Sequence, residues 1–280
     1  MRSLPKPAYN PGDVFTTCIS HIRDNAFRNR LSSCNNFIVQ AEEEFDEKAG
    51  EIELHTIAMA DNVNGIVTVD EMVAVYNARM VKKGSPGRLI YDSILAAPAL
   101  GKCPLCGHRL ASQLDHHLAK TLYPALAVCP YNLIPSCTEC NKIKSAIHPV
   151  GPEEETLNPY YDDIENDEWL IAEIVENTPP SVIFSVQAPE DWDELLKARV
   201  EYHFKILGLS NLYSSNAAGV LTNRRHFMRV IHDRGGINEV YQYIIDSYNS
   251  YRDVNINSWQ TALYKALFDS EWYCDGGFDF

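Results

Sequence analysis

Two pairs of cysteines, each pair separated by two residues, constrain this chain more than any other feature. Cys103-Pro-Leu-Cys106 is followed by a glycine, and thirty residues separate this pair from Cys137-Thr-Glu-Cys140. Pairs of this spacing present their thiolates to one tetrahedral zinc ion at about 2.3 Å. The sequence therefore predicts that Cys103, Cys106, Cys137 and Cys140 hold one structural Zn²⁺. The alternative is two accidental pairs in a cysteine-rich core.

The segment between the two pairs is longer than the roughly 15 to 20 residues of a simple zinc ribbon, so further structure is expected inside it. A disulfide framework would require a small secreted chain, whereas this chain has 280 residues and its opening lacks the apolar stretch of a signal peptide. It also contains no run approaching the roughly 18 apolar residues that a membrane span needs. We expect a cytoplasmic protein without a membrane partner.

Hydrophobic periodicity predicts a mainly helical chain of the α+β class. Two apolar, β-branched runs, Trp169 to Val175 and Ser181 to Val186, flank Asn-Thr-Pro-Pro and predict a β-hairpin. The organisation expected is a helical N-terminal region (1–98), a central zinc-braced module (99–150) and an acidic hairpin with a helical C-terminal region (151–280). Apolar residues at helical spacing predict helices at 13–31, 35–60, 69–80, 192–207, 217–234, 237–251 and 258–268.

Charge is distributed unevenly along the chain. The net charge is -14, which argues against a protein that binds nucleic acid through overall charge alone. The segment from Gly151 to Leu196 contains fourteen Asp and Glu residues and no Lys or Arg. The segment from Gly101 to Val150 contains five basic residues and two acidic ones. The central module is therefore where an anion would be accepted. The acidic segment is expected to be a solvated face; the alternatives are repulsion of stray DNA or docking of a basic partner.

The residues between and after the cysteine pairs suit phosphodiester hydrolysis. An imidazole, as in Asp115-His116, titrates near neutral pH and can accept a proton from water. Carboxylate and amide oxygens are ligands for a hard cation such as Mg²⁺, whereas thiolates suit zinc. Two metal sites of different character are therefore expected.

In their order, these residues resemble the HNH endonuclease family: Asp115-His116, a turn, Asn132-Leu, and a helix carrying Asn141 and then Lys144, braced by two C-x-x-C pairs. The resemblance covers about fifty residues, from Lys102 to roughly Val150. It implies a ββα-metal fold, with two antiparallel strands and a helix around one divalent cation. It further implies that His116 is the general base, that Asp115 and Asn141 hold a catalytic Mg²⁺ or Mn²⁺, and that Asn132 holds the His116 loop in place.

Each of the other polar residues of the module has two interpretations. Lys144, Lys120 and Arg109 are candidate phosphate contacts. The alternative for each is a solvated side chain. His117 is an alternative general base. Alternation along a strand would send His116 and His117 to opposite faces, so only one of them is expected to act. The register of the motif favours His116 and leaves His117 a structural imidazole.

A looser resemblance extends over the whole chain. An HNH module inside a helical chain, with the stretches LNPYYDD and WLIAEIV and a helical tail, is similar to HNH subunits that accompany SMC-like or AAA-type ATPases in prokaryotic antiphage systems, the Septu type among them. Three hypotheses follow: an endonuclease acting on DNA, a zinc-braced binding subunit without cleavage, and a subunit whose cleavage depends on an ATPase. The sequence leaves DNA and RNA open as substrates.

Overall fold

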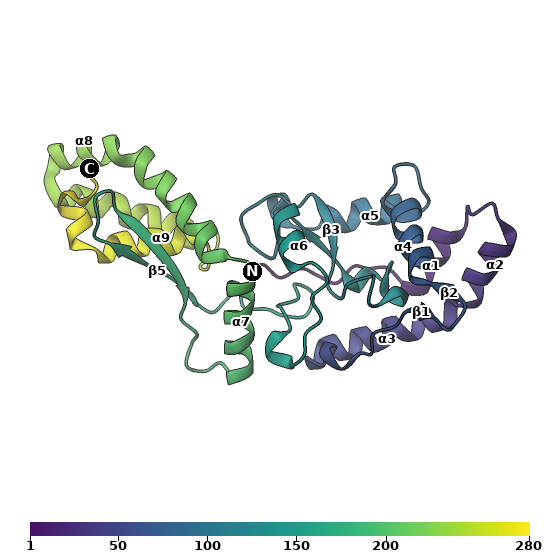
Figure 1. Cartoon of the computed structure of the whole chain (residues 1–280). Helices are drawn as coiled ribbons and strands as arrows, with labels where there is room; N and C mark the ends of the chain where they lie inside the picture. The colour runs from purple at the N-terminus through teal and green to yellow at the C-terminus, as the bar shows by residue number, and fades with distance from the viewer. The chain divides into compact units, whose positions relative to one another are not determined.

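The computed structural model describes residues 1–280, apart from the side chain of Pro11. The chain divides into two compact units, Met1–Asp163 and Ile164–Phe280 (Figure 1). The regions 1–98 and 99–150 both lie in the first unit, whose core joins Met72 and Tyr76 to Leu114 and Leu133. Among the described helices, none has the length and apolar character that a membrane crossing requires.

The first unit is mainly helical with two small antiparallel sheets, which confirms the broad α+β class. A π-helical turn, Tyr76–Val81, continues α4 directly. Strands β1 and β2 pair with each other, as do β3 and β4. The helices and strands are α1 (Pro11–Ile19), α2 (Asn25–Ser33), α3 (Asn35–Glu51), β1 (Asn62–Val63), β2 (Val67–Thr68), α4 (Val69–Val75), α5 (Arg88–Leu95), β3 (Gln113–His116), β4 (Leu133–Ser136) and α6 (Thr138–Lys144).

The first hundred residues contain more breaks than periodicity predicts. The helix expected over 13–31 is two helices, because the Asp24 side chain accepts a hydrogen bond from Phe27 N at 3.0 Å and caps a new helix. The helix expected over 35–60 ends at Glu51, where Ile52 adopts a φ of 60°. The β1–β2 hairpin was not expected, although its Asn-Gly turn, with Gly65 at a φ of 66°, is a recognised hairpin signal.

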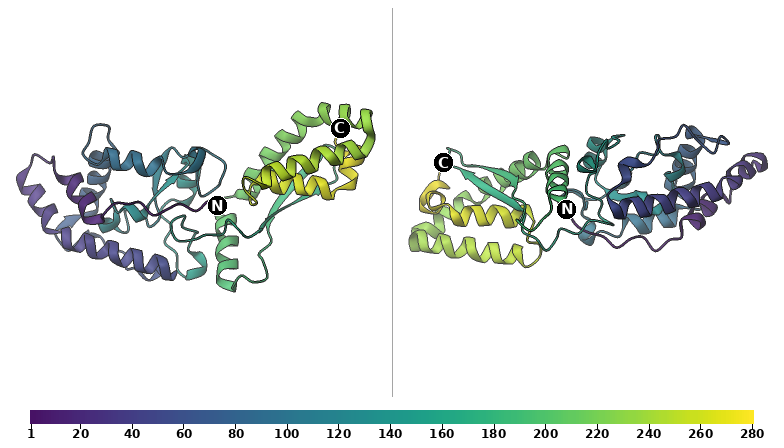
Figure 2. Two further views of the ribbon diagram at one scale, coloured as in Figure 1. Left: turned by 180° about the vertical axis from the view of Figure 1, so that it is seen from behind. Right: turned by 90° about the horizontal axis from the view of Figure 1, so that it is seen from below.

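The second unit packs two helices against the predicted hairpin. The hairpin is confirmed, with Leu170 opposite Val186. Helices α8 and α9 run side by side and contact its strands (Figure 2). Helix α8 is kinked at Gly236, whose φ of 68° and ψ of -160° are open only to glycine. The elements are β5 (Leu170–Val175), β6 (Ser181–Val186), α7 (Glu194–Ile206), α8 (Leu209–Arg252) and α9 (Trp259–Asp269).

Candidate functional site

The first cysteine pair lies in a tight turn between η3 (Ala99–Gly101) and β3. Cys103 N donates to Arg109 O at 2.7 Å, and Gly107 N donates to Cys103 O at 2.8 Å. Gly107 has a φ of 60°, a conformation in which a side chain would be strained, so the glycine after Cys106 is part of the turn. The loop thereby turns both thiols to the same side.

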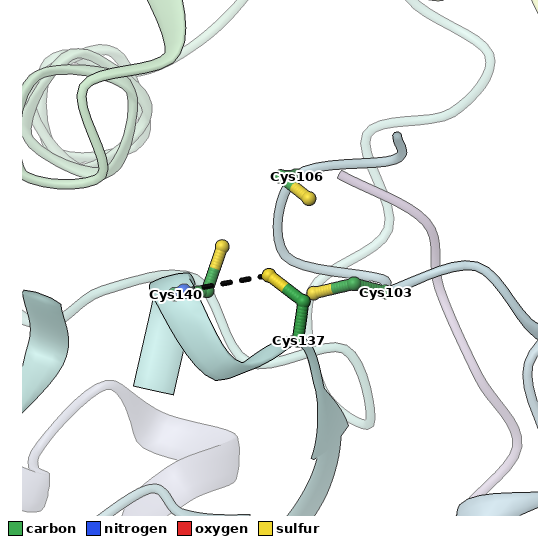
Figure 3. A group of neighbouring side chains, drawn as sticks. All are labelled: Cys103, Cys106, Cys137 and Cys140. Atoms are coloured by element: carbon green, nitrogen blue, oxygen red, sulfur yellow. Dashed lines mark hydrogen bonds between the residues drawn. The ribbon is translucent and has the colours of Figure 1, made fainter. Parts of the chain in front are cut away.

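The second pair lies at the start of α6. Cys137 is the N-cap of this helix, and its Sγ accepts a hydrogen bond from Cys140 N at 3.4 Å. Figure 3 shows the four sulfur atoms turned toward one another, two from the loop and two from the helix. They lie within 4.8 Å of one another and all four residues are buried. A group of four thiols this close can hold one metal ion, and their chemistry suits zinc.

Contacts within the cluster favour deprotonation of some of the thiols. The pKa of Cys137 is lowered to about 6, mainly by hydrogen bonding with Cys103. Hydrogen bonding with Cys103, Cys137 and Cys140 also lowers the pKa of Cys106. Contacts within the same cluster raise the pKa of Cys103 and Cys140, so Cys106 and Cys137 are the thiols that become thiolates, the form that binds metal, most readily.

Strands β3 and β4 and helix α6 together form a ββα element. In the antiparallel pair, Asp115 lies opposite Ile134 and His116 opposite Leu133. Cys137 directly follows β4 and caps α6, so the cysteine cluster fixes the point where strand passes into helix. The last turn of α6 brings Lys144 beside Asp115, with Nζ 3.4 Å from Oδ2.

His116 is held in one orientation and kept neutral. Its Nε2 lies 2.9 Å from Ala127 O, and because a carbonyl only accepts, Nε2 carries the proton. The ring meets Tyr76 edge to face, with centroids 4.5 Å apart. The pKa of His116 is lowered to about 3, mainly by burial. The positive charge of Lys120 lowers it further. The neutral ring therefore has an unprotonated Nδ1, the atom that a general base needs.

The side chain of Asn132 hydrogen-bonds to the backbone of the segment that follows His116. Its Oδ1 accepts from Leu118 N at 2.7 Å, while its Nδ2 donates to Leu118 O at 2.9 Å and to Leu126 O at 3.2 Å. The residue is fully buried. One amide side chain thus binds the backbone at Leu118 and at Leu126, the residue directly before Ala127, which is the hydrogen-bond partner of His116.

Asp115 presents a buried carboxylate to the same region. The residue is 3% exposed, and Oδ2 meets no hydrogen-bond donor in good geometry among the described residues. Burial raises the pKa of Asp115, while the nearby ammonium of Lys144 opposes this. A buried carboxylate oxygen of this kind is a fitting ligand for a divalent cation. Asn141, the other expected ligand, is half-buried on α6 directly after Cys140.

The two lysines that were expected to contact phosphate lie in different surroundings. Lys144 is buried, and its Nζ donates to His116 O at 2.9 Å and to His117 O at 2.6 Å. It therefore braces the end of β3 from inside and does not face solvent. Lys120 is half-buried, and its Nζ lies 5.1 Å from the centre of the Tyr76 ring. Of the two, Lys120 has the more accessible ammonium.

His117 and Arg109 lie beside the central residues. His117 is buried directly after β3, and its backbone N donates to Asn132 O at 2.8 Å. Arg109 is half-buried next to the first cysteine pair, with Nε 3.8 Å from Glu139 Oε2. The backbone of each residue contributes to the local structure, His117 at the end of β3 and Arg109 in the cysteine turn.

Sequence reasoning missed three tyrosines that hold the strands of the site. Tyr76 OH donates to Leu114 O at 3.3 Å, and Tyr91 OH accepts from Leu114 N at 3.3 Å. Tyr160 OH donates to Leu133 O at 2.7 Å. No signal in the sequence distinguishes these residues from ordinary core aromatics, because their partners are backbone groups far away in the chain.

Comparison with known proteins gives one informative similarity. The chain is similar to Protein ea31 of Escherichia phage lambda, with 28% identity over 291 residues, covering 97% of this chain and 98% of that protein. No protein-family model matches the chain, and no solved structure matches it either.

Proposed function

We propose that this chain is a metal-dependent endonuclease of the HNH type, which hydrolyses phosphodiester bonds in nucleic acid, with DNA the first substrate to test. The observation that carries the proposal is the neutral His116 ring, oriented through Nε2 and adjacent in sequence to the buried Asp115 carboxylate. Both residues belong to a ββα element whose junction is fixed by four clustered cysteines. This combination supports hydrolysis better than simple binding, which needs no oriented base.

In this proposal each polar group of the element has a separate task. His116 Nδ1 takes a proton from the attacking water, and Ala127 O stabilises the resulting imidazolium through Nε2–H. Asp115 and Asn141 would hold Mg²⁺ or Mn²⁺, which when bound supplies a Lewis acid for the phosphate and the leaving oxygen. A bound phosphate is anionic, so its approach would raise the pKa of His116 toward the range of a working base.

The four cysteines would hold one structural Zn²⁺ and take no part in the chemistry. Cys137 and Cys140, which would bind the zinc, lie at the start of α6, the helix that carries Asn141 and Lys144. Loss of zinc would therefore disturb the position of the candidate ligand and of the lysine that braces the end of β3.

We also propose that the chain works with a separate ATPase in a prokaryotic antiphage system. The support is the whole-chain resemblance to such subunits, together with the net charge of -14, which disfavours strong DNA binding by the chain alone. A zinc-braced subunit that binds nucleic acid or a partner without cleaving is the competing function.

The test is cleavage of supercoiled DNA, linear DNA and RNA by the purified chain with Mg²⁺ or Mn²⁺. We expect His116→Ala to abolish cutting while the zinc content stays equal to that of the unaltered chain. His226→Ala, at an exposed position of the second unit, is the matched control and should cut normally.

The outcomes separate the three hypotheses. Cutting that depends on His116 supports the nuclease. A zinc-loaded chain that cuts only after an ATPase is added supports the gated subunit. Absence of cutting under both conditions, with nucleic acid still bound, favours the binding subunit.

A further inference from the structure

A hollow of about 450 Å³ lies between α8 and α9 of the second unit, away from the ββα element in sequence. The first half of α8, its last turns and the start of α9 all contribute to it. Its volume is within the range of small-ligand sites. The lining residues are Val220, Asn223, Arg224, Phe227, Tyr251, Trp259, Gln260 and Tyr264.

Aromatic rings form much of this wall, and two of them are unusually exposed. Tyr251 and Tyr264 are stacked, with centroids 5.4 Å apart and planes inclined by 19°. Tyr251 is 39% exposed and Phe227 40% exposed, whereas Tyr264 is buried. Exposed ring faces at the edge of a hollow are suited to stacking with a planar aromatic ligand.

The charge of the hollow is opposite to that of its unit. From Ile164 onward, the sequence contains 18 acidic residues and 9 basic ones. Arg224 is nevertheless the sole charged residue lining the hollow among those the structure describes, and it is exposed. Its neighbours Arg225 and Arg229 pair with Asp279. An anion is therefore favoured beside Arg224.

The other polar residues of the lining are two amides, Asn223 and Gln260. Each offers donors and an acceptor, the groups that pair with the edges of nucleobases. A stacking surface, an arginine and two amides together match a nucleotide, whose base is planar and polar at its edge and whose phosphate is anionic.

We propose that this hollow binds a nucleotide, with the base stacked against Tyr251 and the phosphate paired with Arg224, whose guanidinium carbon lies 6.0 Å from the centre of the Phe227 ring. The ligand is either a free nucleotide or one nucleotide of a single strand, because both present the same chemistry. The inference goes beyond the proposed cleavage and does not depend on it.

Binding is measured in the zinc-loaded His116→Ala chain, so that strand cleavage cannot consume the probe. The probes are the four nucleoside monophosphates, followed by calorimetry, and a fluorescent single-stranded oligothymidine, followed by anisotropy at fixed salt. Saturable binding of a monophosphate identifies a free-nucleotide site, and binding of the oligomer alone identifies a strand site. Either result supports the proposal.

Four substitutions locate the binding. Arg224→Gln and Tyr251→Ala are each expected to weaken binding about 10-fold, whereas Tyr251→Phe keeps the ring and should remain within about 2-fold. Arg234→Gln removes an exposed arginine outside the hollow and should have no effect beyond a small change in salt dependence. The proposal is overturned if neither probe binds, or if binding persists unchanged in both Arg224→Gln and Tyr251→Ala.

Discussion

The side-chain amide of Asn132 joins two backbone segments, and its removal is a residue-scale test of the site. In Asn132→Ala the buried N–H of Leu118 and the carbonyls of Leu118 and Leu126 lose a partner. Unsatisfied buried groups cost on the order of 1 to 3 kcal/mol each, so we expect a clear loss of stability. Hydrogen exchange followed by mass spectrometry should show faster exchange in peptides covering 117–132.

Asn177→Ala provides the control for this substitution, because Asn177 is exposed in the turn of the β5–β6 hairpin. It should leave exchange in 117–132 unchanged. Unaltered exchange in Asn132→Ala would show that the loop is held by other contacts.

Glu42 is a buried carboxyl on α3 whose titration should affect stability. Burial raises its pKa to about 8 from a value of 4.5. Between these values the folded chain binds the proton that the unfolded chain releases, so stability falls as the pH rises toward 8, by at most about 1.4 kcal/mol per pH unit. Glu42→Gln keeps the shape without the charge and should remove this decline.

The effect of Glu42 is best measured between pH 6.5 and 8. His116, whose pKa is lowered to about 3, changes stability in the opposite direction mainly below its ordinary value of 6.5, and this effect is common to all the chains compared. Urea unfolding at both ends of this window should show a smaller loss for Glu42→Gln than for the unaltered chain. Glu43→Gln, at the exposed neighbouring position, should behave like the unaltered chain, and an equal loss in all three chains would contradict the prediction.

At the scale of elements, Cys137 serves both the metal cluster and helix α6. Cys137→Ser replaces the thiol with a hydroxyl, which can still cap the helix but is a poor zinc ligand. We expect the purified variant to lose most of its zinc and, if the proposed function holds, its cleavage. Metal analysis by mass spectrometry, together with the cleavage assay, measures both effects.

Cys274→Ser is the matched control, because Cys274 is also buried but lies in the second unit, where its Sγ donates to Leu267 O at 3.4 Å. It should retain zinc. Full zinc content in Cys137→Ser would mean that the four clustered thiols do not form the metal site.

The elements that sequence reasoning predicted best are those with local signals. The cysteine spacing led to a buried cluster, and the turn residues of the hairpin led to β5 and β6. The inward position of Lys144 was not predictable, because it depends on the carbonyls of His116 and His117, which lie 27 or more residues away in the sequence and meet its Nζ only in the folded chain. The same reason applies to Tyr76, whose partner lies in a distant strand.

At the scale of the whole molecule, charge and chemistry are separated along the chain. The candidate catalytic residues lie between Asp115 and Asn141, whereas the net charge of -14 arises largely from the fourteen acidic residues between Gly151 and Leu196. A polyanion such as DNA is repelled by such a charge over about 10 Å at 0.1 M salt. The chain alone should therefore bind DNA weakly.

Neutralising part of the acidic segment is therefore expected to strengthen DNA binding. Glu168, Glu190 and Asp191 are exposed, so their combined replacement by Gln, Gln and Asn removes charge without disturbing the core. We expect DNA affinity, measured by anisotropy at 50 mM salt, to rise several-fold, because repulsion between like charges is reduced. At 0.5 M salt the two chains should bind alike, since screening removes the difference. Equal affinity at low salt would show that the acidic segment does not restrain DNA binding, and the need for an ATPase partner would then have to rest on other grounds.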